Sequence, residues 1–156
     1  GLVTVTGGKW TTYRAMAEDV LQKCFTSGLL EQRPAGVTTH LPLVGSPAEP
    51  VRHRMCDAQG WHSYGNEADF ARQLPGAGRD LGEGVNEAMV RFAARYEYAR
   101  TVEDVLARRW RVLFLNARQA AAMASDVAEI LQQETGRDPQ HAAFVSLAEQ
   151  YLRLPN

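Results

Sequence analysis

The residues best suited to chemistry stand at the start of the chain. A strand-like run at Leu2–Thr6 leads into the double glycine Gly7-Gly8, and Lys9 follows just before a helical pattern. The first turn of a helix leaves backbone N–H groups unpaired and carries a partial positive charge. Glycine lets another molecule approach the backbone closely, and Lys9 adds a full charge. With the hydroxyls of Thr11 and Thr12, this pattern suits an anionic group or a polarised carbonyl.

The same segment also has a purely structural interpretation. In that interpretation the strand, turn and helix are only joined here, and Thr11 or Thr12 caps the helix. The glycines match no diagnostic nucleotide-binding fingerprint, so their spacing leaves both interpretations open.

The other polar residues give little support for metal ligation or nucleophilic catalysis. His53 and Cys56 can share a helix face, but His40 and His62 do not form a second pair, so we predict no metal site. No Ser–His–Asp arrangement follows from spacing, and we predict no catalytic residue in this chain. Cys24 lies on an apolar helical stripe and is expected in the core.

The composition limits the class of protein. The chain has 156 residues, of which 45% are hydrophobic and 22% charged, as in an ordinary globular domain. Its formal net charge of -1 gives no general basic field, so no nucleic-acid partner is predicted. No apolar run approaches the roughly 20 residues of a membrane-spanning helix. Two cysteines make no disulfide framework, which favours a reducing compartment.

Glycine and proline divide the chain by type of structure. Nine of the 13 glycines and five of the 7 prolines lie in residues 28–84. Because these residues punctuate regular elements, we expect residues 28–84 to be rich in loops and residues 85–156 to be helical. The fold class is therefore predicted to be mainly α, an irregular bundle of about five or six helices preceded by a single strand.

Apolar periodicity and capping residues place the individual helices. Residues 13–25 have one apolar helical face, and weaker helices are expected at 50–58 and 67–74. Stronger patterns cover residues 85–99, 102–113, 117–134 and 139–152. The expected N-caps are Asn66, Thr101, Asn116 and Asp138, and the expected helix ends are Gly28 and Gly136.

Seven arginines make residues 85–118 locally basic, with only four carboxylates in the same stretch. We favour a solvated helix face on which the arginines pair with Glu97, Glu103 and Asp104. The alternative is a docking surface for another domain, another subunit or anionic lipid headgroups. Trp61 and Trp110 are expected to be core or interface anchors.

Three segments, taken in order, resemble one enzyme family. Thr6–Asp19, which reads TGGKWTTYRAMAED, resembles the closing segment of the flavin domain in FAD-dependent glycerol-3-phosphate dehydrogenases. Tyr64–Ala68 resembles the Tyr-Gly-x-Glu-Ala segment of that family, and Tyr98–Ala117 resembles its C-terminal helical domain. The family more usually has Asp where this chain has Asn116, and both residue types cap helices. It more often has Leu in the place of Trp10.

The resemblance implies oxidation of sn-glycerol 3-phosphate to dihydroxyacetone phosphate, with electrons passing through FAD to quinone. It implies that residues 1–27 are the last strand and helix of the FAD-binding domain and that residues 28–156 are the C-terminal helical domain. The implied FAD-binding residues are Gly7, Gly8, Lys9, Trp10 and Thr11. Lys9 is also a candidate ligand of the substrate phosphate. A helix N-terminus with a lysine would stabilise the negative charge of a reduced flavin.

The sequence lacks a dinucleotide-binding turn of its own. The nearest match, Gly76–Gly82, is one residue too long and does not follow a strand, so a glycine-rich linker is expected there. The chain also opens on Gly1 rather than Met. We therefore expect a piece of a longer enzyme that is inactive alone and whose main partner is its own FAD-binding domain. The parent would be cytoplasmic and peripheral to the inner face of the membrane, with a homo-oligomer left open.

The alternative comes from another class of protein. The chain could be a stand-alone helical interaction module that uses its basic helix to hold a protein partner. Residues 34–50 and 76–84 match no known segment, so they do not distinguish the enzyme fragment from the interaction module.

Overall fold

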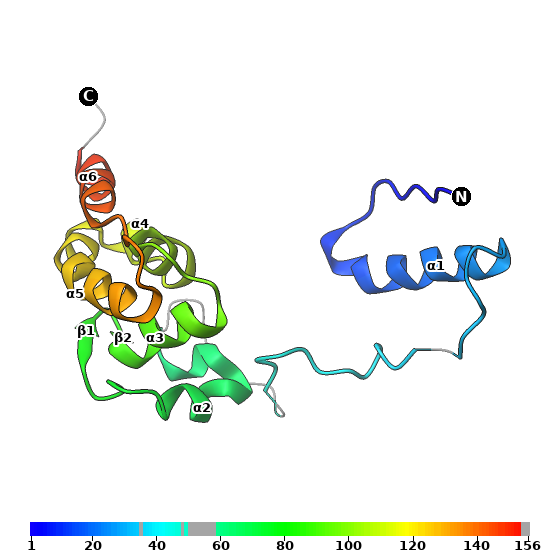
Figure 1. Ribbon diagram of the computed structural model, residues 1–156, viewed down its shortest axis with the longest axis horizontal. Helices are drawn as coiled ribbons and strands as arrows, with labels where there is room; N and C mark the ends of the chain where they lie inside the picture. Colours follow the sequence, from blue (N-terminus) through cyan, green and yellow to red (C-terminus); the bar gives the residue numbers. More distant parts are fainter. Residues whose placement is uncertain (35, 48, 50–58, 154–156) are drawn as a thin grey trace. The chain divides into compact units, whose positions relative to one another are not determined.

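The computed structural model describes residues 1–34, 36–47, 49 and 59–153. The chain divides into two compact units, Gly1–Leu43 and Val44–Asn156 (Figure 1). The helix expected at residues 50–58, with His53 and Cys56, lies outside the described residues. The assignment of residues 1–27 to a flavin domain concerns a longer protein and stays a prediction.

The first unit contains one long helix. A 3-10 turn at Trp10–Thr12 (η1) leads into α1 at Tyr13–Thr26. Gly28 ends the helix as predicted, because its φ of 68° lets the backbone N–H of Leu29 donate to the carbonyl of Cys24 at 2.9 Å.

Two expectations for this unit are wrong. Residues 2–6 form neither helix nor strand, because a strand needs a neighbouring strand and the described chain supplies none there. Cys24 is half-buried rather than in a core, and α1 contains no buried residue. Within the described residues of this unit, the apolar face of α1 therefore lacks the packing partner that its pattern anticipates.

The second unit holds the remaining elements. They are η2 (Trp61–Glu67, 3-10), α2 (Ala68–Arg72), β1 (Asp80–Gly82), β2 (Val85–Asn86), α3 (Glu87–Tyr96), the π-helix η3 (Asp104–Arg109), α4 (Val112–Leu115), α5 (Ala117–Thr135) and α6 (His141–Leu152). The predicted fold class, mainly α with an irregular arrangement of helices, is confirmed.

Helix α5 is the centre of this unit. It packs against α3, α4 and α6, and Figure 1 shows α5 and α6 lying side by side. Ala120, Ala124 and Ala128 on α5 are buried, and these small side chains let the neighbouring helices approach closely. The largest buried side chains around them include Phe92, Met89, Leu106, Leu113, Met123, Ile130, Leu131 and Phe144. One continuous apolar core results.

Several predicted caps are confirmed. The side chain of Asn116 accepts a hydrogen bond from the backbone N–H of Gln119 at 3.1 Å. Thr101 and Asp104 cap one another, since each side chain accepts from the other residue's backbone N–H. Gly136 ends α5 with a φ of 65°.

Two predicted starts are wrong. Asn66 lies inside η2, so α2 begins at Ala68 without a side-chain cap. Asp138 does not begin α6. Its carboxylate instead accepts from the backbone N–H of Gln140 two residues on, which forms an Asx turn and delays the helix to His141.

A small hairpin replaces the linker expected at Gly76–Gly82. β1 pairs antiparallel with β2 across a turn at Glu83-Gly84, where both residues have positive φ. The hairpin packs against α5. The two strands have only three and two residues, which is too short for an alternating pattern in the sequence to indicate a hairpin.

The helix predicted over residues 102–113 is also interrupted. Residues 104–109 form a π-helix, in which the backbone N–H of Trp110 donates to the carbonyl of Val105 at 2.9 Å. Arg111 then takes a left-handed conformation, with a φ of 56°, before α4 begins. Among the described helices, none has the length and apolar character needed to cross a bilayer.

Candidate functional site

The double-glycine turn has the backbone conformation that only glycine adopts without strain. Gly7 has a φ of 76° and Gly8 a φ of 105°. A Cβ on Gly8 would collide with the Sδ of Met16, so a side chain there would displace the end of the Met16 side chain on α1. A Cβ on Gly7 would meet nothing within 4 Å. The turn is thus closed on the side of α1 at Gly8 and open at Gly7.

The residues after the turn start the helix. Thr12 closes this start, because both its backbone N–H and its hydroxyl donate to the carbonyl of Lys9 at 3.0 Å. The hydroxyl of Thr12 is a donor here and accepts from no backbone N–H, so α1 begins without the side-chain cap expected from Thr11 or Thr12. Lys9 forms no ion pair with any described residue, which leaves its ammonium group available.

The structure brings most of the predicted cofactor-binding residues around one hollow. Its volume is about 650 Å³, and its lining includes Gly7, Gly8, Lys9, Trp10 and Tyr13. The lining also continues along the apolar face of α1. Thr11 is exposed and lies outside this lining. Trp10 is 88% exposed, and its ring lies tilted by 37° against that of Tyr13 with ring centroids 6.1 Å apart. The hollow offers a cation, open backbone and an aromatic face.

Acidic and basic groups on α1 pair with one another. Arg14 contacts Glu18 at 2.6 Å, and Lys23 contacts Asp19 at 3.1 Å. These exposed pairs contribute little to stability, and among the described residues no carboxylate forms such a pair with Lys9.

The absence of a metal site stays a prediction, because His53 and Cys56 lie outside the residues that the structure describes. The described residues contain no group of three or more His, Cys, Asp or Glu side chains that could hold an ion.

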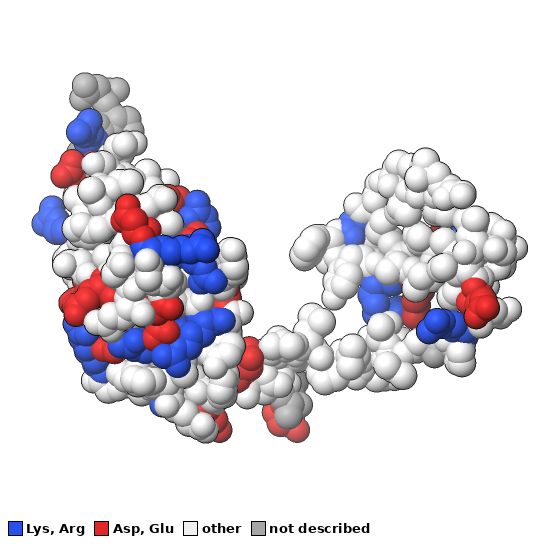
Figure 2. All heavy atoms as spheres, viewed as in Figure 1, with Lys and Arg blue, Asp and Glu red and all other residues white. Residues whose placement is uncertain are grey.

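The arginines of residues 85–118 mostly pair with carboxylates, as the solvated-face interpretation predicts. Arg108 binds Glu103 at 2.8 Å and Asp104 at 3.1 Å, and Arg109 lies 3.5 Å from Glu97. Figure 2 shows basic and acidic side chains interleaved on one face of the second unit. Their charges are compensated locally rather than collected into a basic patch on that face.

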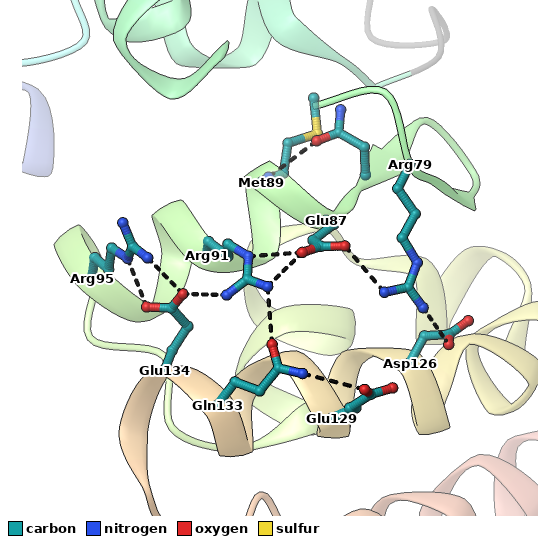
Figure 3. Close-up of polar contacts among 10 residues, drawn as sticks. Arg79, Glu87, Met89, Arg91, Arg95, Asp126, Glu129, Gln133 and Glu134 are labelled. Atoms are coloured by element: carbon teal, nitrogen blue, oxygen red, sulfur yellow. Dashed lines mark hydrogen bonds and ion pairs between the residues drawn. The ribbon is translucent and has the colours of Figure 1, made fainter. Parts of the chain in front are cut away.

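A second set of arginines joins α3 to α5. Glu134 of α5 accepts from Arg91 at 2.5 Å and from Arg95 at 2.6 and 2.7 Å (Figure 3). Arg91 also binds Glu87 on its own helix, and Arg79 connects Glu87 to Asp126. The hydrogen bonds from Arg95 to Glu134 and from Arg91 to Glu87 lower the pKa values of those carboxyl groups. This network is structural, because its charges satisfy one another.

The sequence did not reveal a second cavity, which lies in the helical unit. Its volume is about 340 Å³, and it is lined by Gln59, Ser63, Tyr64, Glu97, Arg109 and Trp110. Tyr64 and Trp110 are buried, and their rings lie 5.7 Å apart. As predicted, Trp110 belongs to the core, and Trp61 packs against it. The residues come from η2, the end of α3 and the end of η3, so no local motif could have indicated the cavity.

Burial changes the acid–base properties around this cavity. Burial raises the pKa of the Glu97 carboxyl, an effect that Arg109 opposes and Glu67 reinforces. Burial, and then the nearby Glu97, raise the pKa of the Tyr64 hydroxyl well above its usual range. Tyr64 therefore stays a neutral hydrogen-bonding group.

Together these features define a helical domain preceded by a glycine turn and helix that lack a core of their own. The model of the family described as the C-terminal domain of alpha-glycerophosphate oxidase matches residues 36–142. The chain belongs to this family.

The relatives found among curated proteins carry a consistent name. The chain is 38% identical over 86% of its length to the mitochondrial glycerol-3-phosphate dehydrogenase SDP6 of Arabidopsis thaliana, of which it covers 26%. It is 31% identical over 84% of its length to a probable mitochondrial glycerol-3-phosphate dehydrogenase of Dictyostelium discoideum, of which it covers 23%. It is 30% identical over 88% of its length to the human mitochondrial glycerol-3-phosphate dehydrogenase, of which it covers 22%. No solved structure matches the chain.

The chain thus spans about a quarter of the length of these curated relatives. The resemblance to the C-terminal domain of glycerol-3-phosphate dehydrogenases is confirmed. The stand-alone interaction module is not favoured, because the relatives align with most of this chain.

Proposed function

We propose that this chain is the C-terminal part of an FAD-dependent glycerol-3-phosphate dehydrogenase and that Gly1–Ser27 complete the flavin site of that enzyme. The reaction would be oxidation of sn-glycerol 3-phosphate to dihydroxyacetone phosphate. Bound FAD would accept the electrons, which then pass to quinone. The family match supports the enzyme class, and the open glycine turn beside an unpaired lysine carries the proposal for the site.

The geometry of the turn fits the pyrimidine edge of a flavin. The open side of Gly7 admits a planar ring close to the backbone, and Gly8 leaves room behind it for the Met16 side chain of α1. Lys9 and the N-terminus of the helix supply positive charge at the same end. Trp10 and Tyr13 would pack against apolar parts of the cofactor or its domain. Thr11, although exposed, is at the helix start and remains in the proposed set.

The isolated chain would be inactive, because the described residues hold no dinucleotide-binding turn after a strand. The exposed side chains of Val5, Trp10, Tyr13 and Leu21 support an FAD-binding domain as the partner of the first unit. We place the parent enzyme in the cytoplasm, peripheral to the inner face of the membrane. The relatives named above are mitochondrial proteins, so fractionation of cells is the direct test.

The test of the site uses Lys9→Ala in the full-length enzyme. Loss of the cation should raise KM for glycerol 3-phosphate or weaken FAD binding about tenfold, the effect of one charge-assisted hydrogen bond. The matched control is Lys23→Ala, since Lys23 lies on the same helix and pairs only with Asp19 among the described residues. Unchanged kinetics and unchanged flavin content in Lys9→Ala would assign Lys9 a structural role. An active, FAD-containing preparation of the isolated 156-residue chain would refute the proposal that this chain needs a separate FAD-binding domain for activity.

A further inference from the structure

The end of helix α3 carries a tyrosine in a conformation that usually belongs to glycine. The helix ends at Tyr96, and the backbone N–H of Ala99 donates back to the carbonyl of Ala93 at 2.9 Å. Tyr98, which makes this turn, has a φ of 59° and is the one aromatic residue among the described non-glycine residues with positive φ. A glycine would end the helix here with less strain. The tyrosine at this position therefore points to a role for its side chain.

The role of the Tyr98 side chain is not packing inside the second unit. Its residue is 73% exposed, and the Cζ of Arg100 lies 4.1 Å from the centroid of its ring. The guanidinium group is itself fixed, because its Nη1 donates to the carbonyls of Ala94 and Ala99, both at 2.8 Å. A cation stacked on the ring restricts the rotation of the ring. Tyr98 is thus held in place at the surface with most of its area uncovered, as in a preorganised anchor of an interface.

Two further aromatic rings are exposed at the same end of α3. Phe70 of α2 and Tyr96 of α3 are 43% and 54% exposed, and their ring centroids lie 5.0 Å apart. Both rings also lie near the buried Phe92, at centroid distances of 6.1 and 5.1 Å, so they extend the core to the surface. We call Phe70, Tyr96 and Tyr98 the aromatic patch. Aromatic side chains are enriched at the centres of protein–protein interfaces, where they contribute most of the binding energy.

The charges on the helices that carry the patch are mostly paired. Arg72 contacts Asp69 at 2.7 Å, and Arg95 contacts Glu134 at 2.6 Å. Arg100 has no carboxylate partner among the described residues, and its Nη1 donates to backbone carbonyls. Attraction to anionic lipid headgroups takes a cluster of several uncompensated cations, and one is not enough. The patch therefore fits a protein surface better than a membrane.

We propose that the aromatic patch docks against the FAD-binding part of the parent enzyme, with Tyr98 as its anchor. This inference rests on the proposed function, because it takes the chain as the C-terminal part of that enzyme. The chain covers 26% and 23% of two relatives, so about three-quarters of such a protein is present as a partner. Residues 27–60 alone separate α1 from η2, and so short a connection holds the two parts at an effective concentration on the order of millimolar. A second copy of the enzyme at micromolar concentration competes poorly with a partner tethered in this way.

The test measures docking in the full-length enzyme. A specific protease site inserted between Leu43 and Val44, the boundary of the two units, allows the chain to be cut there. Gel filtration over a dilution series then gives the dissociation constant of the two pieces. The native pieces should co-elute at micromolar concentration. Tyr98→Gly removes the ring and accepts the positive φ, and it should raise the dissociation constant at least tenfold, as expected for the loss of an anchor residue.

Two controls separate docking from folding. Tyr151→Ala removes a ring that is 52% exposed elsewhere on the second unit, and it should leave the dissociation constant unchanged. In the isolated 156-residue chain, Tyr98→Gly should keep Tm within about 2 °C of the native value, because the ring buries little there and glycine relieves the strain.

Several results would overturn the proposal. Native pieces that separate, or equal dissociation constants for the native and Tyr98→Gly pieces, would mean that the patch does not dock on the FAD-binding part. A lowered Tm of the isolated Tyr98→Gly chain would assign Tyr98 a structural role. Loss of a dimer in Tyr98→Gly with unaltered docking would assign the patch to a second copy, and loss of binding to anionic phospholipid vesicles would assign it to a membrane.

The proposed function can fail separately from this inference. A native enzyme whose pieces co-elute but which contains no FAD, or does not oxidise glycerol 3-phosphate, would refute the proposed function and leave the docking contact in place.

Discussion

The connection between α3 and α5 gives the sharpest test of what holds the helical unit together. Glu134 on α5 accepts three hydrogen bonds from arginines on α3, and its side chain is only 9% exposed. Glu134→Gln removes the charge while it preserves the size and one acceptor oxygen. The change therefore tests the ionic contribution with little loss of packing.

The magnitude follows from the exposure of the two partners. The Arg91 side chain is 14% exposed, and a hydrogen bond to a charged group contributes about 1.5–3 kcal/mol where it is shielded from water. The Arg95 side chain is 39% exposed, so its contribution falls towards the ~0.5 kcal/mol of a surface pair. We expect Glu134→Gln to lower the free energy of unfolding by about 2 kcal/mol, or Tm by roughly 8 °C.

The matched control is Glu129→Gln on the same helix. The Glu129 carboxylate accepts from Gln133 at 3.2 Å, an exposed contact without an arginine (Figure 3). This control should change stability by no more than about 0.5 kcal/mol. Urea unfolding followed by circular dichroism measures both variants. If the two variants lose the same stability, the network in Figure 3 contributes nothing and our reasoning is wrong.

The difference in unfolding free energy between the native chain and Glu134→Gln should depend on pH, which gives a further check. The pKa of Glu134 is lowered by the hydrogen bond from Arg95 and also by that from Arg91, so the folded state holds the ionised form more strongly than the unfolded state does. Its contribution is fully present above the ordinary value of 4.5 and is lost as the pH falls through the lowered pKa. The stability gap between the native chain and Glu134→Gln should therefore narrow in acid, and a constant gap would contradict an ionic origin.

Two further variants test backbone features of the same unit. Gly65 has a φ of 53°, and a Cβ there would lie 1.8 Å from the carbonyl oxygen of Gly45, so Gly65→Ala should destabilise the unit by about 3 kcal/mol in urea unfolding. Gly136→Ala is its control, because it also has a positive φ but meets no atom within 4 Å. Equal losses would show that steric contact is unimportant. Asn86→Ala removes the side-chain acceptor that binds the backbone N–H of Met89 at 3.1 Å and should cost about 1–2 kcal/mol, whereas Asn86→Asp should retain most of the cap. A neutral Asn86→Ala variant would show that this cap is dispensable.

Sequence periodicity predicted the helical unit because its elements are stabilised by local patterns. The alanine face of α5 and the caps at Thr101 and Asn116 involve residues close in sequence, and the structure confirms them. The network around Glu134 escaped prediction, because its partners are separated by 39 or more residues. A count of charges within residues 85–118 could not include a carboxylate from the end of α5.

The strand and the buried helix face predicted for the first unit were wrong for a different physical reason. Its pattern anticipates a buried strand and a buried helix face, yet burial depends on a partner rather than on the pattern itself. The candidate site at Gly7-Gly8 was indicated by residue type, since positive φ and a helix start can be anticipated locally. The cavity around Tyr64 and Trp110 could not be anticipated, because three separate segments form it.

The π-helix at Asp104–Arg109 also constrains how chains of this kind can change in length. A π-helical turn holds one residue more than an α-helical turn, so deletion of a single residue there would restore α-helical spacing. The bond from the backbone N–H of Trp110 to the carbonyl of Val105 would be lost with the wide turn, and the cavity wall formed by Arg109 and Trp110 would have to repack. Insertions and deletions in related chains should accordingly accumulate elsewhere, and this turn should keep its residue count even where its residue types change.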